Sequence, residues 1–352
     1  MDNLAHTLAG LALAEAGLKR RTALATVTLA IAANLPDVDA ITYFFGSGVD
    51  SLAFRRGWTH GPVAMVVLPL LLATAMVIWD RTVRNRRGRR HTPVNVGWLI
   101  VVALIGVLSH PLLDLLNTYG VRLLMPFSDR WFYGDALFII DPWLWATLGL
   151  GVFFSRRRAR RERDAGAGIA SRKRSSREVP TAGRWVTRPA RIAIGVIVLY
   201  AVAMAVLGEI GGRIVARQSP ASGNSRAMIA PVPLTPFRRD VIREIGDQYE
   251  RGTVRFGLSP TFVRSELIEK ESAAPGVAAA TRTHDGAAFL SWARYPRFMT
   301  ETVGDSIRVR MSDLRYADAA GRGWASVIVM VPAESIGSRG VRVPSFAPDT
   351  GR

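Results

Sequence analysis

Residues 96–117 read VGWLIVVALIGVLSHPLLDLLN, an apolar run that ends among polar side chains. A helix needs roughly 20 apolar residues to cross the hydrocarbon core of a bilayer, and this run has that length. Its first part carries no ionisable residue, whereas its last third contains His110 and Asp114. The stretch therefore predicts a transmembrane helix with chemically reactive side chains near one end.

Comparable apolar runs lie on both sides of this stretch. They meet or approach spanning length at residues 22–45, 60–79, 136–154 and 190–210, with a shorter run at residues 4–18. Because the short run is marginal for a full crossing, the sequence predicts five or six transmembrane helices. The predicted fold is an all-α polytopic membrane bundle followed by a small external domain.

The excess of positive charge lies beside these apolar runs. The chain has 352 residues and a net charge of +18. Twenty-two Lys and Arg residues fall within 19–21, 81–90 and 156–191, against four in the loops at 46–59 and 118–135. Cytoplasmic loops of membrane proteins are enriched in Lys and Arg, so the first three segments are expected in the cytoplasm. The charge is thus explained by topology, and nucleic acid is not an expected partner.

The composition changes after residue 217, where proline-rich sequence leads into shorter segments. Strand-length pieces such as Ala288–Trp292, Ser306–Met311 and Trp324–Pro332 favour a β-rich or α+β domain. The predicted organisation is a bundle at 1–154, a basic cytoplasmic linker at 155–189, a last transmembrane helix at 190–216, an external domain at 217–332 and a disordered tail at 333–352. The expected location is a cytoplasmic (inner) membrane, with the C-terminal domain on the periplasmic side.

Ionisable side chains within the apolar runs converge at one depth. Under the predicted topology, these residues all lie near the outer boundary: His6, Asp37, Asp39, His60, His110, Asp114 and Asp141. His110, for example, lies about 21 Å along a helix that begins in the cytoplasm, at 1.5 Å per residue. Since the topology rests on Lys and Arg alone, the common depth independently indicates a site.

The spacing and chemistry of these residues favour a metal. His110 and Asp114 share one helix face, and Asn117 lies a turn further along. Asp37 and Asp39 would diverge on a regular helix unless the proline before them breaks it. Imidazole and carboxylate together suit Zn²⁺ first, with Mn²⁺ or Fe²⁺ as alternatives. Taken singly, each residue also has a structural explanation, such as helix capping by Asp37 or by Asp141.

At these residues the chain resembles a known family. The matching elements are His6 with Gly10, residues 35–39, residues 56–60, residues 110–114 with Asn117 and Gly120, and Asp141-Pro142. This pattern is similar to the membrane-bound metal-dependent hydrolases, also described as LexA-binding, inner membrane-associated hydrolases. The resemblance covers about residues 1–150, and residues 292–298 are similar to longer members. Gly61 stands where the family often has serine, a departure that leaves His60 intact.

The resemblance implies hydrolysis by metal-activated water. The predicted ligands are His6, His60, His110 and a subset of Asp37, Asp39 and Asp114. A remaining carboxylate among Asp39, Asp114 and Asp141 would act as general base. Arg56 and Asn117 are the predicted substrate-binding residues. The expected substrate is an ester or phosphoester of a lipid or envelope component at the outer face of the membrane.

Two other classes of function use the same sequence features. A metal- or proton-coupled transporter would need polar residues across the whole bilayer, and the apolar first part of residues 96–117 disfavours this. A non-catalytic membrane scaffold would bind no metal. The expected partners are membrane lipids, and the linker at 155–189 is the place where a protein partner would bind.

Overall fold

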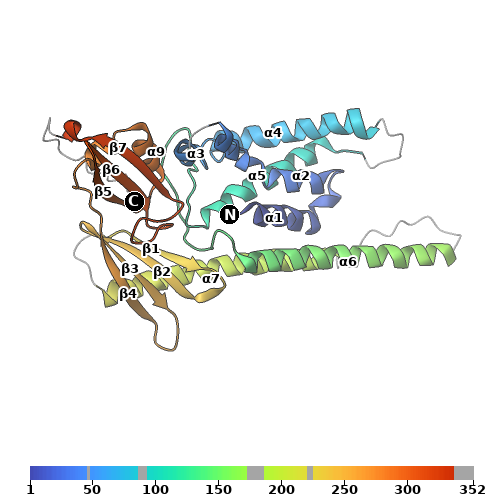
Figure 1. Cartoon of the computed structure of the whole chain (residues 1–352). Helices are drawn as coiled ribbons and strands as arrows, with labels where there is room; N and C mark the ends of the chain where they lie inside the picture. Colours follow the sequence, from blue (N-terminus) through green and yellow to red (C-terminus); the bar gives the residue numbers. More distant parts are fainter. Residues whose placement is uncertain (46–47, 86–92, 173–185, 220–224, 337–352) are drawn as a thin grey trace. The chain divides into compact units, whose positions relative to one another are not determined.

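The computed structural model describes residues 1–45, 48–85, 93–172, 186–219 and 225–336 (Figure 1). The chain forms two compact units. The first comprises Met1–Val38 and Arg56–Val206, and the second comprises Asp39–Arg55 and Leu207–Arg352. Most of the predicted tail, residues 337–352, lies outside the described residues.

The first unit is a bundle of helices. They are α1 (Asn3–Glu15), α2 (Ala25–Ala32), α4 (Pro62–Trp79), α5 (Val96–Leu115), α6 (Pro142–Arg172) and the first part of α7 (Arg188–Gln218). Its core lies where α2, α4 and α5 meet, around Leu29, Leu72 and Val102. All three side chains are almost fully removed from solvent, so their burial stabilises this junction.

Two glycines let α2 pack closely between α1 and α5. A Cβ atom added to Gly10 of α1 would lie 2.5 Å from the carbonyl oxygen of Leu29. A Cβ atom added to Gly106 of α5 would lie 2.5 Å from the Cβ atom of Ala32. Only glycine permits this approach, and each glycine lies one turn from a histidine of the predicted site. The close packing therefore brings those histidines together with the end of α2.

Three helices among the described residues are long and apolar enough to cross a membrane. They are Pro62–Arg84, Val96–Leu115 and Arg188–Gln218. The prediction of five or six such helices is therefore too high. The run at 22–45 is divided between the short α2 and a 3₁₀ segment, Leu35–Phe44, and the run at 136–154 becomes helical only at Pro142. A helical membrane part followed by a β domain is confirmed.

Helix α6 continues to Arg172, through much of the stretch for which the sequence predicts a flexible linker. The first part of this stretch is rich in arginine and alanine, which are good helix formers. The stretch lacks an apolar periodicity because this part of the helix has no buried face, and not because the chain is disordered. Residues 173–185 of the predicted linker lie outside the described residues, and its last two residues begin helix α7.

The second unit contains two antiparallel sheets. One has the order β1 (Ala227–Val232), β2 (Thr235–Ile245), β3 (Gln248–Arg255), β4 (Thr261–Glu269), and the other β5 (Pro296–Val303), β6 (Ser306–Asp313), β7 (Ser326–Pro332). Buried residues from both sheets, among them Ile242 and Tyr249, share one core cluster with Tyr295 and Leu314. The predicted strands at Ser306–Met311 and Trp324–Pro332 are confirmed as β6 and β7.

The third predicted strand, Ala288–Trp292, is wrong. These residues lie in helix α9 (His284–Trp292), whose N-terminus is capped by Thr283. The Thr283 hydroxyl accepts a hydrogen bond from the Gly286 N–H at 3.1 Å, which favours the helix over a strand. Helix α3 (Gly48–Phe54), from the loop predicted at 46–59, packs against α9 within this unit.

A buried polar network joins the end of α7 to the first sheet. Glu250 of β3 accepts hydrogen bonds from the Ser219 hydroxyl at 2.9 Å and from Nε of Arg243 at 2.9 Å. Burial raises the pKa of Glu250, but the hydrogen bonds from Ser219, Arg264 and Arg243 outweigh it and lower the pKa. Glu250 is therefore charged at neutral pH and fastens α7 to β2 and β3.

Candidate metal centre

Helix α5 supplies two residues of the site, His110 and Asp114, one turn apart on its buried face. Both side chains are fully buried. The helix begins at Asn95, whose side-chain oxygen accepts a hydrogen bond from the Trp98 N–H at 3.0 Å. The i, i+4 spacing then directs the imidazole and the carboxylate to the same place, as the sequence predicts.

The orientation of His110 is fixed by the end of α2. Its Nδ1 atom lies 2.7 Å from the carbonyl oxygen of Ala33, the residue that follows α2. A carbonyl only accepts hydrogen bonds, so Nδ1 carries the proton and donates it. The Nε2 atom therefore faces Asp37 Oδ1 at 3.7 Å and Asp114 Oδ2 at 3.5 Å. In neutral imidazole this places a lone pair opposite two carboxylates, an arrangement that either a proton on Nε2 or a metal ion among the three groups would satisfy.

His60 approaches the same carboxylate from the segment before α4. Its Nδ1 atom contacts the Thr59 hydroxyl at 2.9 Å, and its Nε2 atom lies 3.5 Å from Asp114 Oδ2. This repeats the arrangement at His110, in which one ring nitrogen is held by a neighbour and the other faces the cluster. Such outer partners are typical of metal-bound histidines.

His6 of α1 lies against this group. Its ring stacks on that of His110, with ring centroids 3.7 Å apart and an angle of 14° between the planes. Its Nε2 atom is 3.4 Å from Asp114 Oδ1. The structure thus brings His6 into the site, on the side of Asp114 opposite to the oxygen that faces His60 and His110.

The donor set fits a divalent metal. One ligand atom from each of Asp37, His60, His110 and Asp114 lies within 4.8 Å of all the others, and all four residues are buried. Tetrahedral zinc with ligands at about 2.1 Å places neighbouring ligand atoms about 3.4 Å apart. The three separations that join His60, His110, Asp37 and Asp114 are 3.5, 3.5 and 3.7 Å. They exceed an ordinary hydrogen bond and are close to the spacing that a shared ion requires.

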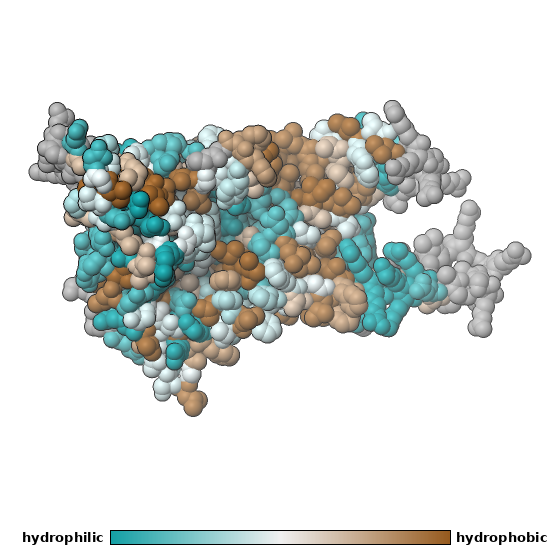
Figure 2. Space-filling model, viewed as in Figure 1, coloured by the Kyte–Doolittle hydropathy of each residue, from teal (hydrophilic) through white to brown (hydrophobic). Residues whose placement is uncertain are grey.

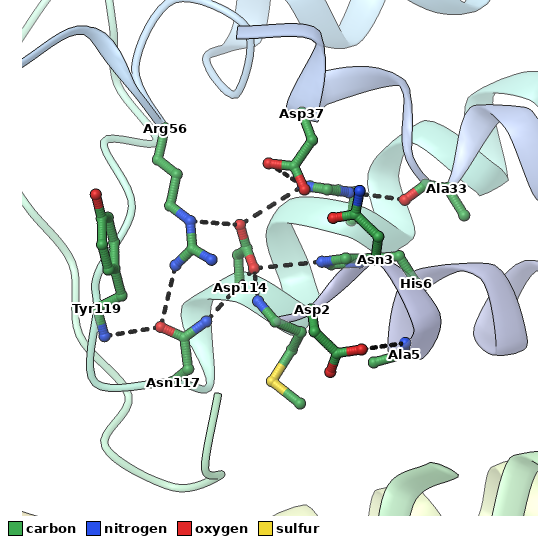
Figure 3. A network of polar contacts seen from close by, with 12 residues as sticks. Asp2, Asn3, Ala5, His6, Ala33, Asp37, Arg56, Asp114, Asn117 and Tyr119 are labelled. Atoms are coloured by element: carbon green, nitrogen blue, oxygen red, sulfur yellow. Dashed lines mark hydrogen bonds and ion pairs between the residues drawn. The ribbon is translucent and has the colours of Figure 1, made fainter. Parts of the chain in front are cut away.

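Arg56 and Asn117 hold Asp114 in this structure (Figure 3). Arg56 Nε lies 3.1 Å from Asp114 Oδ2, and Arg56 also donates to Asn117 Oδ1 at 3.1 Å and to the Gly120 carbonyl at 3.3 Å. Its guanidinium lies over the Tyr119 ring at 4.4 Å. The backbone of Arg56 has φ = 53°, a left-handed conformation that costs free energy outside glycine. Substrate binding by these two residues stays a prediction; their observed contacts orient Asp114.

Two predicted catalytic carboxylates have other partners. Asp141 caps helix α6: its Oδ1 accepts from the Trp143 and Leu144 N–H groups at 3.0 and 3.1 Å. Its Oδ2 accepts from the Tyr200 hydroxyl at 3.0 Å. Asp39 belongs to the second unit, where its carboxylate lies 3.5 Å from Arg55 Nε. Neither residue is part of the four-residue cluster, and a helix cap explains Asp141.

Several contacts of the site have no signature in the sequence. They include the Ala33 carbonyl, the ion pair of Arg56 with Asp114, and the Met1 amino group, which also contacts Asp114. The first depends on where α2 ends, and the second on a left-handed residue in an irregular segment. Among these outer contacts, only the one between the Thr59 hydroxyl and His60 joins neighbours in the sequence and could have been predicted from it.

Comparisons with known proteins support a membrane family. A family model described as "YdjM inner membrane protein" matches residues 1–209. The "Inner membrane protein YbcI" of Escherichia coli (strain K12) is 32% identical over 126 residues, which is 35% of this chain and 64% of that protein. The chain therefore spans just under two thirds of the length of this curated relative. No solved structure matches.

Proposed function

We propose that this chain, which belongs to the YdjM inner membrane protein family, is a metal-dependent hydrolase that cleaves an ester or phosphoester of a membrane lipid. The observation that carries the proposal is the pair of buried histidines whose Nε2 atoms face Asp114 at 3.5 Å. Arg56 and the Met1 amino group pair with Asp114, but neither donates a hydrogen bond to the two Nε2 atoms in this structure, and a metal ion would satisfy both of these.

Three or all four of the clustered residues Asp37, His60, His110 and Asp114 would hold the metal and leave one coordination position for water, with Zn²⁺ first and Mn²⁺ or Fe²⁺ as alternatives. Such an ion lowers the pKa of a bound water and polarises the bond under attack. With both carboxylates used as ligands, His6 takes the role of the base. Its ring is held by stacking on His110, and its Nε2 atom lies within the same group of polar atoms.

An apolar groove favours a lipid as the substrate. A groove of about 400 Å³ has His60 in its wall and is otherwise lined by apolar side chains of α4, α5 and Leu123, among them Met65, Leu108 and Leu112. Figure 2 shows hydrophobic residues gathered on the surface of the α4 region. Leu112 itself is 64% exposed. An acyl chain could therefore lie in the groove with its ester or phosphoester beside His60.

Filling this groove should separate long-chain from short-chain substrates. Leu112→Trp is expected to lower kcat/KM for nitrophenyl palmitate by at least about tenfold, because each buried CH₂ contributes about 0.8 kcal/mol. The rate with nitrophenyl acetate and the metal content should stay close to wild type. Alkyl phosphoesters of nitrophenol with long and short chains provide the second substrate pair.

Leu104→Trp is the matched control, since Leu104 lies on the same helix and is exposed but does not line the groove. Equal loss with both tryptophan variants would contradict the groove as the acyl site. If the metal-loaded wild type hydrolyses neither the carboxylic esters nor the phosphoesters, the proposal that this protein is a hydrolase loses its support.

The orientation of the chain can be tested with single cysteines, because the sequence contains none. We propose that Arg156–Arg163 faces the cytoplasm and the β domain faces the periplasm, from the positive-inside asymmetry. Leu258→Cys, at a fully exposed residue of the β domain, should be labelled by an impermeant maleimide in intact cells. Glu162→Cys, exposed on α6, should be labelled only after lysis. The reverse pattern would invert the topology.

A further inference from the structure

A second groove lies between α6 and α7, within the first unit. Its volume is about 530 Å³, and it is lined by Leu150, Phe154, Ile192 and Ala193 together with Arg158 and others. Gly151 brings the two helices close, since a Cβ atom there would lie 2.5 Å from the Cβ atom of Ala193. Among the α6 residues that line the groove, Arg158 is the closest to the C-terminus of the helix. The groove is therefore apolar along its length and cationic at one end.

The cationic end is continuous with a cluster of arginines. Six arginines occur within Arg156–Arg163, and their side chains are exposed. Arg156 forms an ion pair with Glu15 at 3.2 Å, which fixes this part of α6 against α1. By the positive-inside rule this end of α6 lies at the cytoplasmic boundary of the membrane. It is the depth at which lipid phosphates are found.

The apolar part of the groove opens onto an exposed apolar surface of the two helices. Ile192 and Phe154 are 64% and 46% exposed, and Leu199, two turns further along α7, is 69% exposed. Helix α7 is also one of the candidate membrane spans. A ligand that fits must combine an acyl chain with an anionic head, because the groove offers hydrocarbon contact and then guanidinium groups.

We propose that the α6/α7 groove is a binding site for one anionic phospholipid of the cytoplasmic leaflet. One acyl chain lies along Leu150, Phe154 and Ile192, and the phosphate is bound by Arg158. Planar guanidinium suits phosphate because it donates two parallel hydrogen bonds. The groove is separate from the His60 groove and involves other helices, so this inference does not depend on the proposed hydrolase.

Native mass spectrometry of the full chain, equilibrated in detergent with equal amounts of phosphatidylglycerol and phosphatidylcholine, tests the site. Wild type should retain phosphatidylglycerol in clear preference to phosphatidylcholine. Arg158→Gln should lower that preference by more than about fivefold, since it removes the direct contact with the phosphate as well as a nearby charge, which alone is worth about fivefold. Arg157→Gln removes the same charge from a neighbour outside the groove lining and should lower the preference clearly less than Arg158→Gln does, because no direct phosphate contact is lost.

The apolar half of the site has its own matched pair. Phe154→Ala should reduce lipid retention, whereas Phe153→Ala, an exposed neighbour outside the lining, should not. A measurement on wild type needs no variant: excess glycerol 3-phosphate should fail to displace phosphatidylglycerol if the acyl chain contributes. Displacement by glycerol 3-phosphate would show a site for phosphate alone. Equal losses in Arg157→Gln and Arg158→Gln, or equal retention of both lipids by wild type, would overturn the proposal.

Discussion

His110→Ala and His60→Ala should each abolish binding of a divalent metal, with a loss of affinity of more than about 100-fold. Changes to outer partners alone cost roughly 10- to 100-fold, so removal of a ligand should cost more. In each variant one of the two Nε2 atoms that face Asp114 at 3.5 Å is lost. The remaining set of two carboxylates and one imidazole lacks a nitrogen ligand that Zn²⁺ favours, and it holds the ion less tightly. Hydrolytic activity should fall with the metal.

Metal content is measured by elemental mass spectrometry on purified chain, and affinity by titration of the chelator-treated protein. His284→Ala is the control, because His284 lies in the second unit and its Nε2 atom contacts Asp50 at 2.5 Å. This variant should keep the full metal content. If wild type binds no metal, or if both histidine variants keep the full metal stoichiometry, a non-catalytic membrane scaffold becomes the better interpretation of this protein.

The sequence predicts the four residues of the buried cluster, because their placement depends on local spacing and depth, and it also proposes His6 and Asp39, which lie outside that cluster. His110 and Asp114 are one helical turn apart, and that relation survives in any fold that keeps α5 a helix. Asp37 and His60 lie in irregular segments, yet both belong to the cluster, as the common depth predicts. Asp141 satisfied the same depth argument and is a helix cap instead. Depth alone cannot separate a carboxylate that faces the cluster from one that faces its own helix.

The number of spanning helices could not be predicted from hydropathy. Apolar residues face lipid in one helix and protein in another, and hydropathy scores both alike. Helix α2 has only eight residues, about 12 Å at 1.5 Å per residue, and Leu29 and Ala32 within it are fully buried. The proline and asparagine after α2 break the run that seemed long enough to span. In the β domain, strand-length pieces with β-branched and aromatic residues predicted β6 and β7, whereas the cap at Thr283 decided the helix at residues 284–292.

Asp114→Asn should have the second large effect, on stability as well as on metal binding. Arg56 is only 5% exposed and its Nε atom lies 3.1 Å from Asp114. Removal of the carboxylate charge leaves this guanidinium buried without its main counter-charge. Breaking a buried ion pair in this way costs about 3–5 kcal/mol. Unfolding of the metal-free protein in mixed micelles, followed by tryptophan fluorescence, should therefore begin at a lower fraction of denaturing detergent.

The double variant Arg56→Gln/Asp114→Asn separates the two roles of Asp114. The double variant leaves no uncompensated buried charge, which is the main cost of breaking such a pair, so it should regain most of the lost stability. It should not regain the metal, because the amide at residue 114 is a poorer ligand than the carboxylate whose oxygen faces His60 and His110. A double variant that binds metal as wild type does would show that Asp114 orients the histidines without being a ligand. One that stays as unstable as Asp114→Asn would show that the histidines, and not Arg56, depend on this charge.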